Sequence, residues 1–168
     1  MGSNLGKLFS SILLNRLLIF RNMYCPDPIS QLGFCKNAQT SDHIFVLNTC
    51  IQKYTAANNR LYTCFIDFQK AFDTVCREAL LYKLFTLGIQ GNFFKCLQYM
   101  YSNSKAKIKL INKISESIDV MTGTEQGHPM SPELFKCYLL EVSYNLDNTP
   151  GVEPPTLNSA KNYPLTLG

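Results

Sequence analysis

The sequence predicts a mixed domain of the α/β (α+β) class, in which helices pack on a small, mainly antiparallel sheet. Three observations lead to this prediction. Apolar residues recur at helical spacing through much of the chain, a short aromatic and β-branched run lies between helical segments, and two further extended runs flank a turn. With 168 residues, of which 46% are apolar, the chain is long enough to bury one globular core.

Five helices are expected. The first covers 5–21, where the apolar face is broad enough that we expect the helix to be largely buried. The second covers 40–57 and begins with side chains that favour the N-cap position. The remaining helices are expected at 77–87, 92–101 and 132–146. Gly88 follows the third as a left-handed cap, and Ser131 precedes the last as its N-cap.

Two regions are predicted to be extended. Residues 61–67 form a short run with aromatic and β-branched residues, which predicts a buried strand that ends in a carboxylate. Residues 105–111 alternate basic and apolar side chains and are expected to pair with 117–121 as a hairpin, across a turn at Asn112 and Lys113.

Three lysines of the first hairpin strand, Lys105, Lys107 and Lys109, are spaced to share one face of that strand. They suit contact with a nucleic-acid backbone. Lysines also protect exposed edge strands from aggregation, and the pattern favours the two explanations equally.

Charge and cysteine content restrict the class of protein. A net charge of +4 suits a polyanionic partner without requiring one. The seven cysteines include no C-x-x-C pair and no zinc-ligand spacing, which predicts reduced thiols in an intracellular protein of the nucleus or cytoplasm, not a secreted one. Cys50, Cys64 and Cys137 lie among apolar residues and are expected to be buried. The apolar run at 8–20 is too short to span a membrane.

Two motifs point to a family. Residues 65–73, FIDFQKAFD, fit the pattern F-x-D-F-x-K-A-F-D, and residues 126–132, QGHPMSP, fit Q-G-x-x-x-S-P about sixty residues later. Together they resemble the first two palm motifs of the reverse transcriptases of non-LTR (LINE-like) retrotransposons. The resemblance implies a right-hand polymerase fold, with a fingers-like segment at 1–59, a partial palm at 60–148 and a proline-rich tail at 149–168.

The resemblance also implies a chemistry. Such enzymes extend a DNA primer on an RNA template with deoxynucleotides, and Mg²⁺ ions stabilise the attacking and leaving oxygens. By resemblance, Asp67 is a catalytic metal ligand and the backbone carbonyl of Phe68 a further metal contact. Without the motif, Asp67 would be a strand-end carboxylate that caps the next turn.

Three more residues take roles by resemblance. Phe72 occupies the position where the family places a bulky ring under the incoming sugar, which excludes a ribose 2′-hydroxyl. The alternative is a core aromatic at the start of a helix. Gln126 and Gly127 are expected to form a loop against the nucleotide and template, where glycine lets the backbone approach closely.

The sequence also departs from the family. No Y/F-x-D-D segment, which completes the family's metal site, and no thumb follow the second motif. We therefore expect negligible polymerase activity from this chain alone, since losing roughly 4 kcal/mol of transition-state stabilisation slows a reaction about a thousandfold. Three residues also differ from those usual in the family. Cys35 stands in place of an arginine, Cys76 in place of a tryptophan, and Glu125 in place of a basic residue.

Whether the chain is an enzyme stays open, and two alternatives remain. The first alternative is a non-catalytic RNA-binding or interaction remnant of a retroelement, which would keep the basic strand without needing Asp67. A translated fragment that does not fold stably is the other alternative, because missing palm strands would leave an exposed sheet edge.

Overall fold

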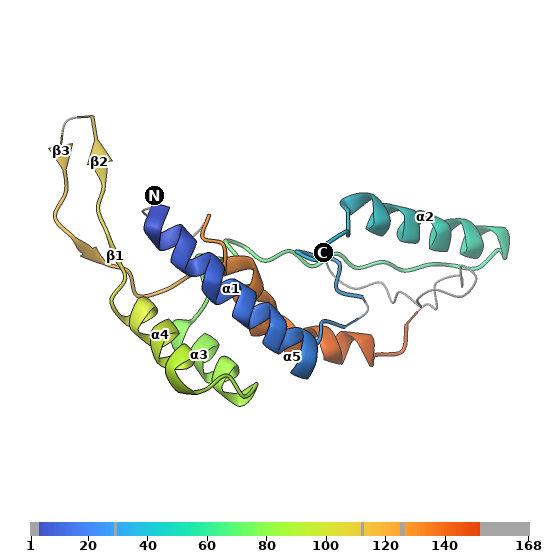
Figure 1. Ribbon diagram of the computed structural model, residues 1–168. Helices are drawn as coiled ribbons and strands as arrows, with labels where there is room; N and C mark the ends of the chain where they lie inside the picture. Colours follow the sequence, from blue (N-terminus) through green and yellow to red (C-terminus); the bar gives the residue numbers. More distant parts are fainter. Residues whose placement is uncertain (1–3, 29, 112, 125–126, 152–168) are drawn as a thin grey trace. The chain divides into compact units, whose positions relative to one another are not determined.

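A computed structural model describes residues 4–28, 30–111, 113–124 and 127–151 (Figure 1). The chain forms two compact units, each built from two separate segments. The first unit comprises the chain up to Phe20 together with Gln69–Tyr138, and the second comprises Arg21–Phe68 together with the chain from Leu139 onward.

The first unit is built around α1 (Asn4–Tyr24), α3 (Arg77–Thr86), α4 (Gly91–Ser102) and the beginning of α5 (Ser131–Asp147). These elements share one apolar core of buried residues: Leu13, Leu17, Val75, Leu80, Leu84, Ile89, Leu97, Tyr101, Met130, Leu134 and Cys137. Gly88 separates α3 from α4 with φ +92°, so the predicted left-handed cap is confirmed. The predicted helices at 77–87, 92–101 and 132–146 are likewise confirmed within a residue.

The burial predicted for α1 is only partly correct. Ser10, Leu13 and Leu17 form a narrow buried stripe. By contrast, Leu8 and Ile12 are 60% and 51% exposed. Periodicity shows where apolar side chains lie on a helix, but the width of the face that becomes buried depends on how much of it the other helices cover.

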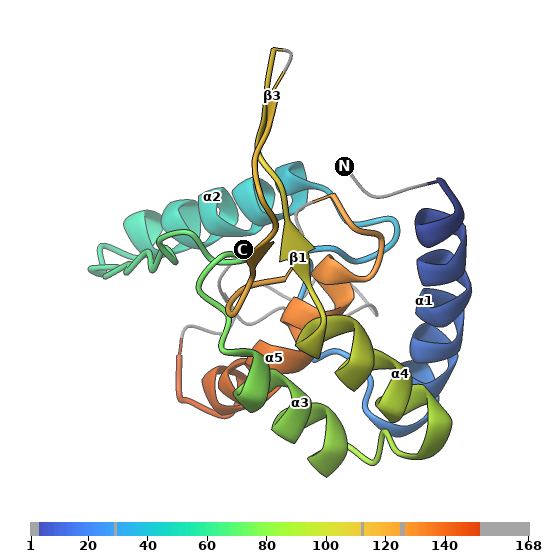
Figure 2. The same cartoon turned by 90° about the vertical axis from the view of Figure 1, so that its left-hand side faces the viewer.

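The predicted hairpin is confirmed as two short antiparallel ladders. β1 (Lys105–Ala106) pairs with β4 (Ile118–Asp119), and β2 (Lys109–Leu110) pairs with β3 (Lys113–Ile114). Figures 1 and 2 show the hairpin extending away from α3 and α4. Its turn comes one residue earlier than predicted, because Lys113 already pairs with Leu110.

The expectation that three lysines share one face of a single strand is wrong in one respect. Lys105 and Lys109 lie in different ladders, and Lys107 lies between them outside either strand. All three side chains are exposed. The interruption separates the two ladders, so the alternation of a continuous strand does not hold across it.

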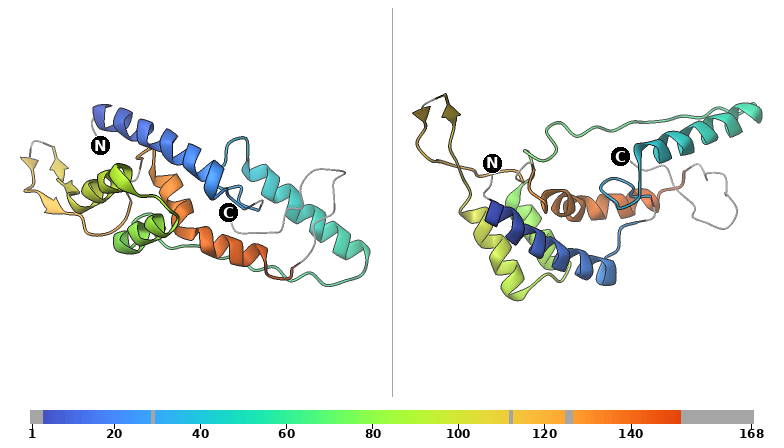
Figure 3. Two further views of the ribbon diagram at one scale, coloured as in Figure 1. Left: turned by 60° about the horizontal axis from the view of Figure 1, so that its bottom comes forward. Right: turned by 45° about the horizontal axis from the view of Figure 1, so that its top comes forward.

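In the second unit, α2 (Thr40–Ala56) begins and ends close to the predicted residues. The backbone N–H of Gln39 donates to Oδ2 of Asp42 at 2.8 Å, which satisfies a donor that the start of a helix leaves without an intrahelical partner. Figure 3 shows the segment after α2 as an extended trace that turns back at the end of the helix and runs beside it.

The buried strand predicted at 61–67 is wrong. These residues form neither strand nor helix, and Tyr62 and Phe65 are 83% and 79% exposed. Aromatic and β-branched composition favours a strand only where a neighbouring strand supplies backbone hydrogen bonds and a face to pack against. Among the described residues no strand pairs with this segment.

The described part of the chain is therefore a helical protein with a small antiparallel ribbon, as the α+β prediction states in its coarse form. None of its helices combines the length and apolar character that crossing a membrane requires.

Three cysteines were expected to be buried. Cys50 and Cys137 are buried as predicted, whereas Cys64 is exposed, since it lies in the 61–67 segment that does not form a buried strand. Burial raises the pKa of the Cys50 thiol. The positive charge of Lys53 lowers this pKa, but its effect is smaller.

We expect Cys64 to react with a maleimide much faster than Cys50 in the folded chain at pH 7.5, because the thiolate is the reactive form and Cys50 is both buried and less ionised. Peptide mapping after brief labelling measures the difference, and labelling in urea provides the control. Equal labelling of the two thiols in the folded chain would contradict the buried position of Cys50.

Candidate functional site

The residues predicted from the two motifs fall in different parts of the structure. Asp67 and Phe68 belong to the second unit and are exposed, in the irregular segment after α2. Phe72 and Gly127 belong to the first unit. Gln126, like Glu125, lies outside the described residues. The structure therefore describes the surroundings of Phe72 and Gly127 within one unit.

The described residues include no cluster of metal-binding side chains around Asp67. Across 4–28, 30–111, 113–124 and 127–151, no group of three or more histidine, cysteine, aspartate or glutamate side chains could hold a metal ion. Mg²⁺ requires near-octahedral oxygen coordination, and one carboxylate on an irregular exposed segment does not supply it. The role of Asp67 as a metal ligand therefore stays a prediction from the motif.

The first motif is joined to the loop before the second by backbone hydrogen bonds. Residues 69–74 form a tight turn that places the Phe72 carbonyl at 2.8 Å from the amide of Thr124. The amide of Gly123 donates to the carbonyl of Val75 at 2.9 Å. A Cβ atom on Gly123 would lie 2.8 Å from the Asp73 carbonyl oxygen, so the two backbones touch. Gly123 also has φ +81°, which favours glycine.

Arg77 fixes this junction from inside the first unit. Its side chain is buried, and its Nε donates to the Gly123 carbonyl at 2.9 Å. One terminal nitrogen donates to the carbonyls of Tyr101, at 2.8 Å, and Val120. The guanidinium carbon also lies 5.2 Å from the centre of the Tyr101 ring. Arg77 therefore links the start of α3 and the end of α4 to the loop that contains Gly123 and Gly127 (the glycine loop).

Phe72 is half-buried and not part of a helix. Its ring centre lies 5.0 Å from that of Phe135 in α5, at an interplanar angle of 38°. The alternative of a core aromatic at a helix start is not met, since Phe72 is not one of the buried core residues and α3 begins only at Arg77.

The loop beyond Gly127 is fixed to α1. Ser10 Oγ and His128 Nε2 are 2.5 Å apart, and the amide of Ser131 donates to the His128 carbonyl at 3.1 Å, where α5 begins. Gly127 itself is exposed at φ +77°, and a Cβ there would meet nothing within 4 Å. Gly127 therefore has free space around it, although the next residue, His128, is held against α1.

A serine beside a histidine invites comparison with a nucleophile and its base. The Ser10 hydroxyl also lies 2.7 Å from the Gly6 carbonyl, to which it can only donate, so this bond competes with donation to Nε2 of His128. Ser10 is only 1% exposed, so the contact with His128 holds the loop against α1.

Thr124 carries a further polar group at the junction. The residue is 4% exposed, and its Oγ1 has no hydrogen-bond partner among the described residues. Sequence reasoning did not find Thr124, Arg77 or the His128 contact. Each depends on tertiary contacts that local periodicity does not encode, such as the 46-residue separation between Arg77 and Gly123.

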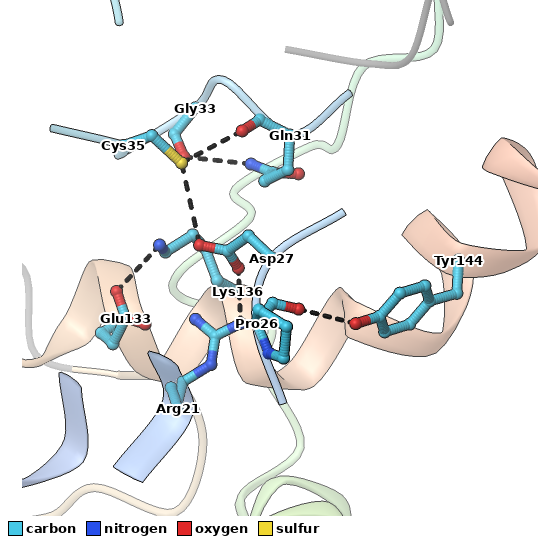
Figure 4. Close-up of polar contacts among 9 residues, drawn as sticks. All are labelled: Arg21, Pro26, Asp27, Gln31, Gly33, Cys35, Glu133, Lys136 and Tyr144. Carbon is cyan, nitrogen blue, oxygen red and sulfur yellow. Dashed lines mark hydrogen bonds and ion pairs between the residues drawn. The ribbon is translucent and has the colours of Figure 1, made fainter. Parts of the chain in front are cut away.

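In the second unit, Figure 4 shows a polar cluster around Cys35. Cys35 Sγ lies 3.0 Å from the Gln31 carbonyl oxygen and 3.7 Å from Oδ2 of Asp27. Arg21, which is buried, forms an ion pair of 2.5 Å with Asp27. The cysteine thus occupies a place beside a carboxylate, where it gives only weak hydrogen bonds.

Tyr144 and the buried pair in α5 complete the polar groups of Figure 4. The Tyr144 hydroxyl donates to the Pro26 carbonyl at 2.6 Å, and burial is the main cause that raises its pKa. Separately, Lys136 and Glu133 form an ion pair of 3.0 Å within α5, and both side chains are buried. Their positions three residues apart place them on the same side of the helix.

A cavity of about 330 Å³ lies elsewhere in the first unit. It is lined by Arg16, Leu17, Phe20, Gly88, Ile89, Gln90 and Phe93. None of these residues belongs to either motif, so the cavity is separate from the predicted site.

Comparison with known proteins gives the family. A family model described as reverse transcriptase (RNA-dependent DNA polymerase) matches residues 2–157. The chain is 28% identical over 124 residues to a retrovirus-related Pol polyprotein from type-1 retrotransposable element R2 of Popillia japonica, covering 73% of this chain and 17% of that protein. It is 26% identical over 142 residues to an RNA-directed DNA polymerase from mobile element jockey of Drosophila funebris, covering 83% of this chain and 15% of that protein.

The chain therefore spans less than a fifth of the length of these relatives. The match covers both motifs from which the family was predicted, with their order and spacing. On this basis the chain belongs to the reverse transcriptase (RNA-dependent DNA polymerase) family.

Proposed function

We propose that the chain supplies the nucleotide-binding part of an RNA-directed DNA polymerase, with an RNA template, a DNA primer, deoxynucleotides and Mg²⁺ as partners. In this proposal 1–59 correspond to fingers and 60–148 to part of a palm, and the protein works in the nucleus or cytoplasm. The observation that carries it is the direct hydrogen bond between the first motif, at the Phe72 carbonyl, and the loop of the second, at the Thr124 amide.

The geometry of the first unit supports specific roles. Phe72 is held by Phe135 on one side and by the glycine loop at its backbone, so its ring has a fixed place. We assign it the exclusion of a ribose 2′-hydroxyl. Gly127 is exposed with open space around it, which suits close approach of a nucleotide to the backbone, and Gln126 is assigned to the same loop.

Asp67 and the Phe68 carbonyl are proposed as metal contacts from the motif alone. The described residues do not complete a metal site around them. Lys105, Lys107 and Lys109 are proposed to contact the nucleic-acid backbone, because all three are exposed on the hairpin.

Primer extension on an RNA template in Mg²⁺ tests the proposal. It is measured for this chain and for a longer product of the same coding region, each with and without Asp67→Asn. Extension that Asp67→Asn abolishes supports the proposal, and extension that survives it contradicts the assignment of Asp67.

A second candidate function is RNA binding without catalysis. It is favoured by the exposed basic hairpin together with the irregular segment that carries Asp67. This candidate predicts salt-dependent RNA binding that Asp67→Asn leaves unchanged, and no extension by the longer product.

Replacing Phe72 with valine is expected to reduce the preference for deoxynucleotides over ribonucleotides by roughly tenfold or more, because a smaller side chain leaves room for the 2′-hydroxyl. Competition binding with the two triphosphates measures the ratio. Phe85→Val is the matched control, since Phe85 also packs on a second ring, that of Phe94, at 5.6 Å between centres. An equal change in both variants would contradict the assigned role.

A further inference from the structure

The tip of the hairpin is apolar and exposed. Its large aliphatic residues are Ile108, Leu110, Ile111 and Ile114, which are 63%, 69%, 85% and 65% exposed. An isolated two-stranded ribbon is at best marginally stable in water and gains nothing from displaying aliphatic groups. The folding of the ribbon therefore does not account for the exposed aliphatic residues at its tip.

Strand register distributes these groups over both faces. Lys109 lies opposite Ile114, and Leu110 lies opposite Lys113. Directly opposed residues share a face of the ribbon, and successive residues alternate between faces. Each face at the tip therefore presents one lysine beside one aliphatic side chain. Neither face is wholly apolar, as a face that packs against a core would be.

Ile111 adds a second feature. It lies at the turn with φ +46°, a left-handed conformation that β-branched residues rarely adopt. The residue at a turn of this kind is usually glycine, asparagine or aspartate. A strained and almost fully exposed isoleucine at the end of a protruding ribbon is typical of a functional contact more than of a folding requirement.

The charge of the ribbon identifies the kind of partner. Between 105 and 119 there are four lysines and two carboxylates. Lys105 lies 3.7 Å from Asp119 at the base, whereas Lys109 and Lys113 lie in the ladder next to the tip. A polyanion with apolar surfaces between its charges complements this pattern, and the stacked bases and flanking phosphates of a duplex have that form.

We propose that this tip enters an RNA duplex at the junction between paired and unpaired nucleotides. Ile111 and its aliphatic neighbours insert beside the last base pair and unstack it, while the lysine on each face contacts the phosphates of one of the two diverging strands. The arrangement needs a ribbon with equivalent faces, which the register provides. The inference rests on the proposed function only in naming RNA as the duplex.

A forked RNA duplex with 2-aminopurine in the last base pair tests this, using the 168-residue chain without Mg²⁺ or nucleotides. The unaltered chain is expected to raise the fluorescence, because 2-aminopurine brightens when it unstacks. Ile111→Asn combined with Ile114→Asn is expected to abolish the rise and to weaken binding to the fork roughly tenfold, with binding to single-stranded RNA kept. Asparagine tolerates positive φ, so the turn itself is retained.

Two controls accompany it. Ile44→Asn removes an isoleucine of similar exposure, 68%, from α2 and is expected to change neither signal. Lys109→Gln with Lys113→Gln is expected to lower the slope of log affinity against log salt by about 1.8 for the duplex, whereas Lys95→Gln alone, in α4, does not.

No fluorescence rise with the unaltered chain, or a rise that survives the double asparagine variant, overturns the inference. Self-association that the double variant abolishes, without any effect on RNA, also overturns it and assigns the tip to a protein partner. Because the assay involves no synthesis, failed primer extension with intact unstacking counts against the polymerase proposal alone.

Discussion

Replacing Arg77 with methionine is expected to lower the free energy of unfolding of the first unit by about 3–5 kcal/mol. Methionine keeps an apolar stem but none of the donors, so the carbonyls of Gly123, Tyr101 and Val120 lose their charged partner inside the protein. Unpaired buried carbonyls cost more than the net value of the bonds removed. Urea unfolding followed by far-UV circular dichroism measures the change, since the chain has no tryptophan.

Arg60→Met is the matched control. Arg60 is exposed, and the same substitution there is expected to change the free energy of unfolding by less than about 0.5 kcal/mol. If Arg77→Met were as mild as its control, the three carbonyls would not depend on the guanidinium, and Arg77 would not anchor the glycine loop.

Replacing Gly123 with alanine is expected to cost about 2–4 kcal/mol of stability and to weaken nucleotide binding. The left-handed conformation accounts for about 1–2 kcal/mol of it. The remainder comes from a Cβ atom 2.8 Å from the Asp73 carbonyl oxygen, a backbone atom that cannot move aside as a flexible side chain would. Separation of these backbones would also break the hydrogen bond from Thr124 to the Phe72 carbonyl.

Gly127→Ala separates the cost of the left-handed conformation from the cost of the contact with the Asp73 backbone. Gly127 has nearly the same φ, +77°, but open space where the new methyl group would lie. We therefore expect a loss of stability of only about 1–2 kcal/mol there. Urea unfolding of both variants compares them directly, and equal losses would show that backbone contact with Asp73 contributes nothing.

The comparison of sequence with structure shows which features local pattern encodes. Helices α3, α4 and α5 and the Gly88 cap follow from apolar spacing and from the special conformation of glycine, both of which act over a few residues. The hairpin follows from alternation, with an error of one residue at the turn that alternation does not determine. Both motifs were found because they are contiguous.

The failures involve partners that are distant in sequence. Residues 61–67 have strand composition, yet a strand requires a neighbour, and composition says nothing about whether one is present. Cys64 is exposed for the same reason. The anchors of the candidate site also escaped prediction: neither Arg77 nor Ser10 lies in a motif, and only the folded chain brings them to Gly123 and His128.

The central claim is that the turn at Phe72 and the loop around Gly127 form a deoxynucleotide site. Photocrosslinking of this chain with 4-thio-deoxythymidine triphosphate, followed by peptide mapping, tests it most directly. We expect crosslinks within 69–76 or 123–130 that unlabelled deoxynucleotide suppresses. The ribonucleotide analogue should form them less well in the unaltered chain and equally well in Phe72→Val. Crosslinks confined to other segments, or equal labelling by both analogues in the unaltered chain, would contradict it.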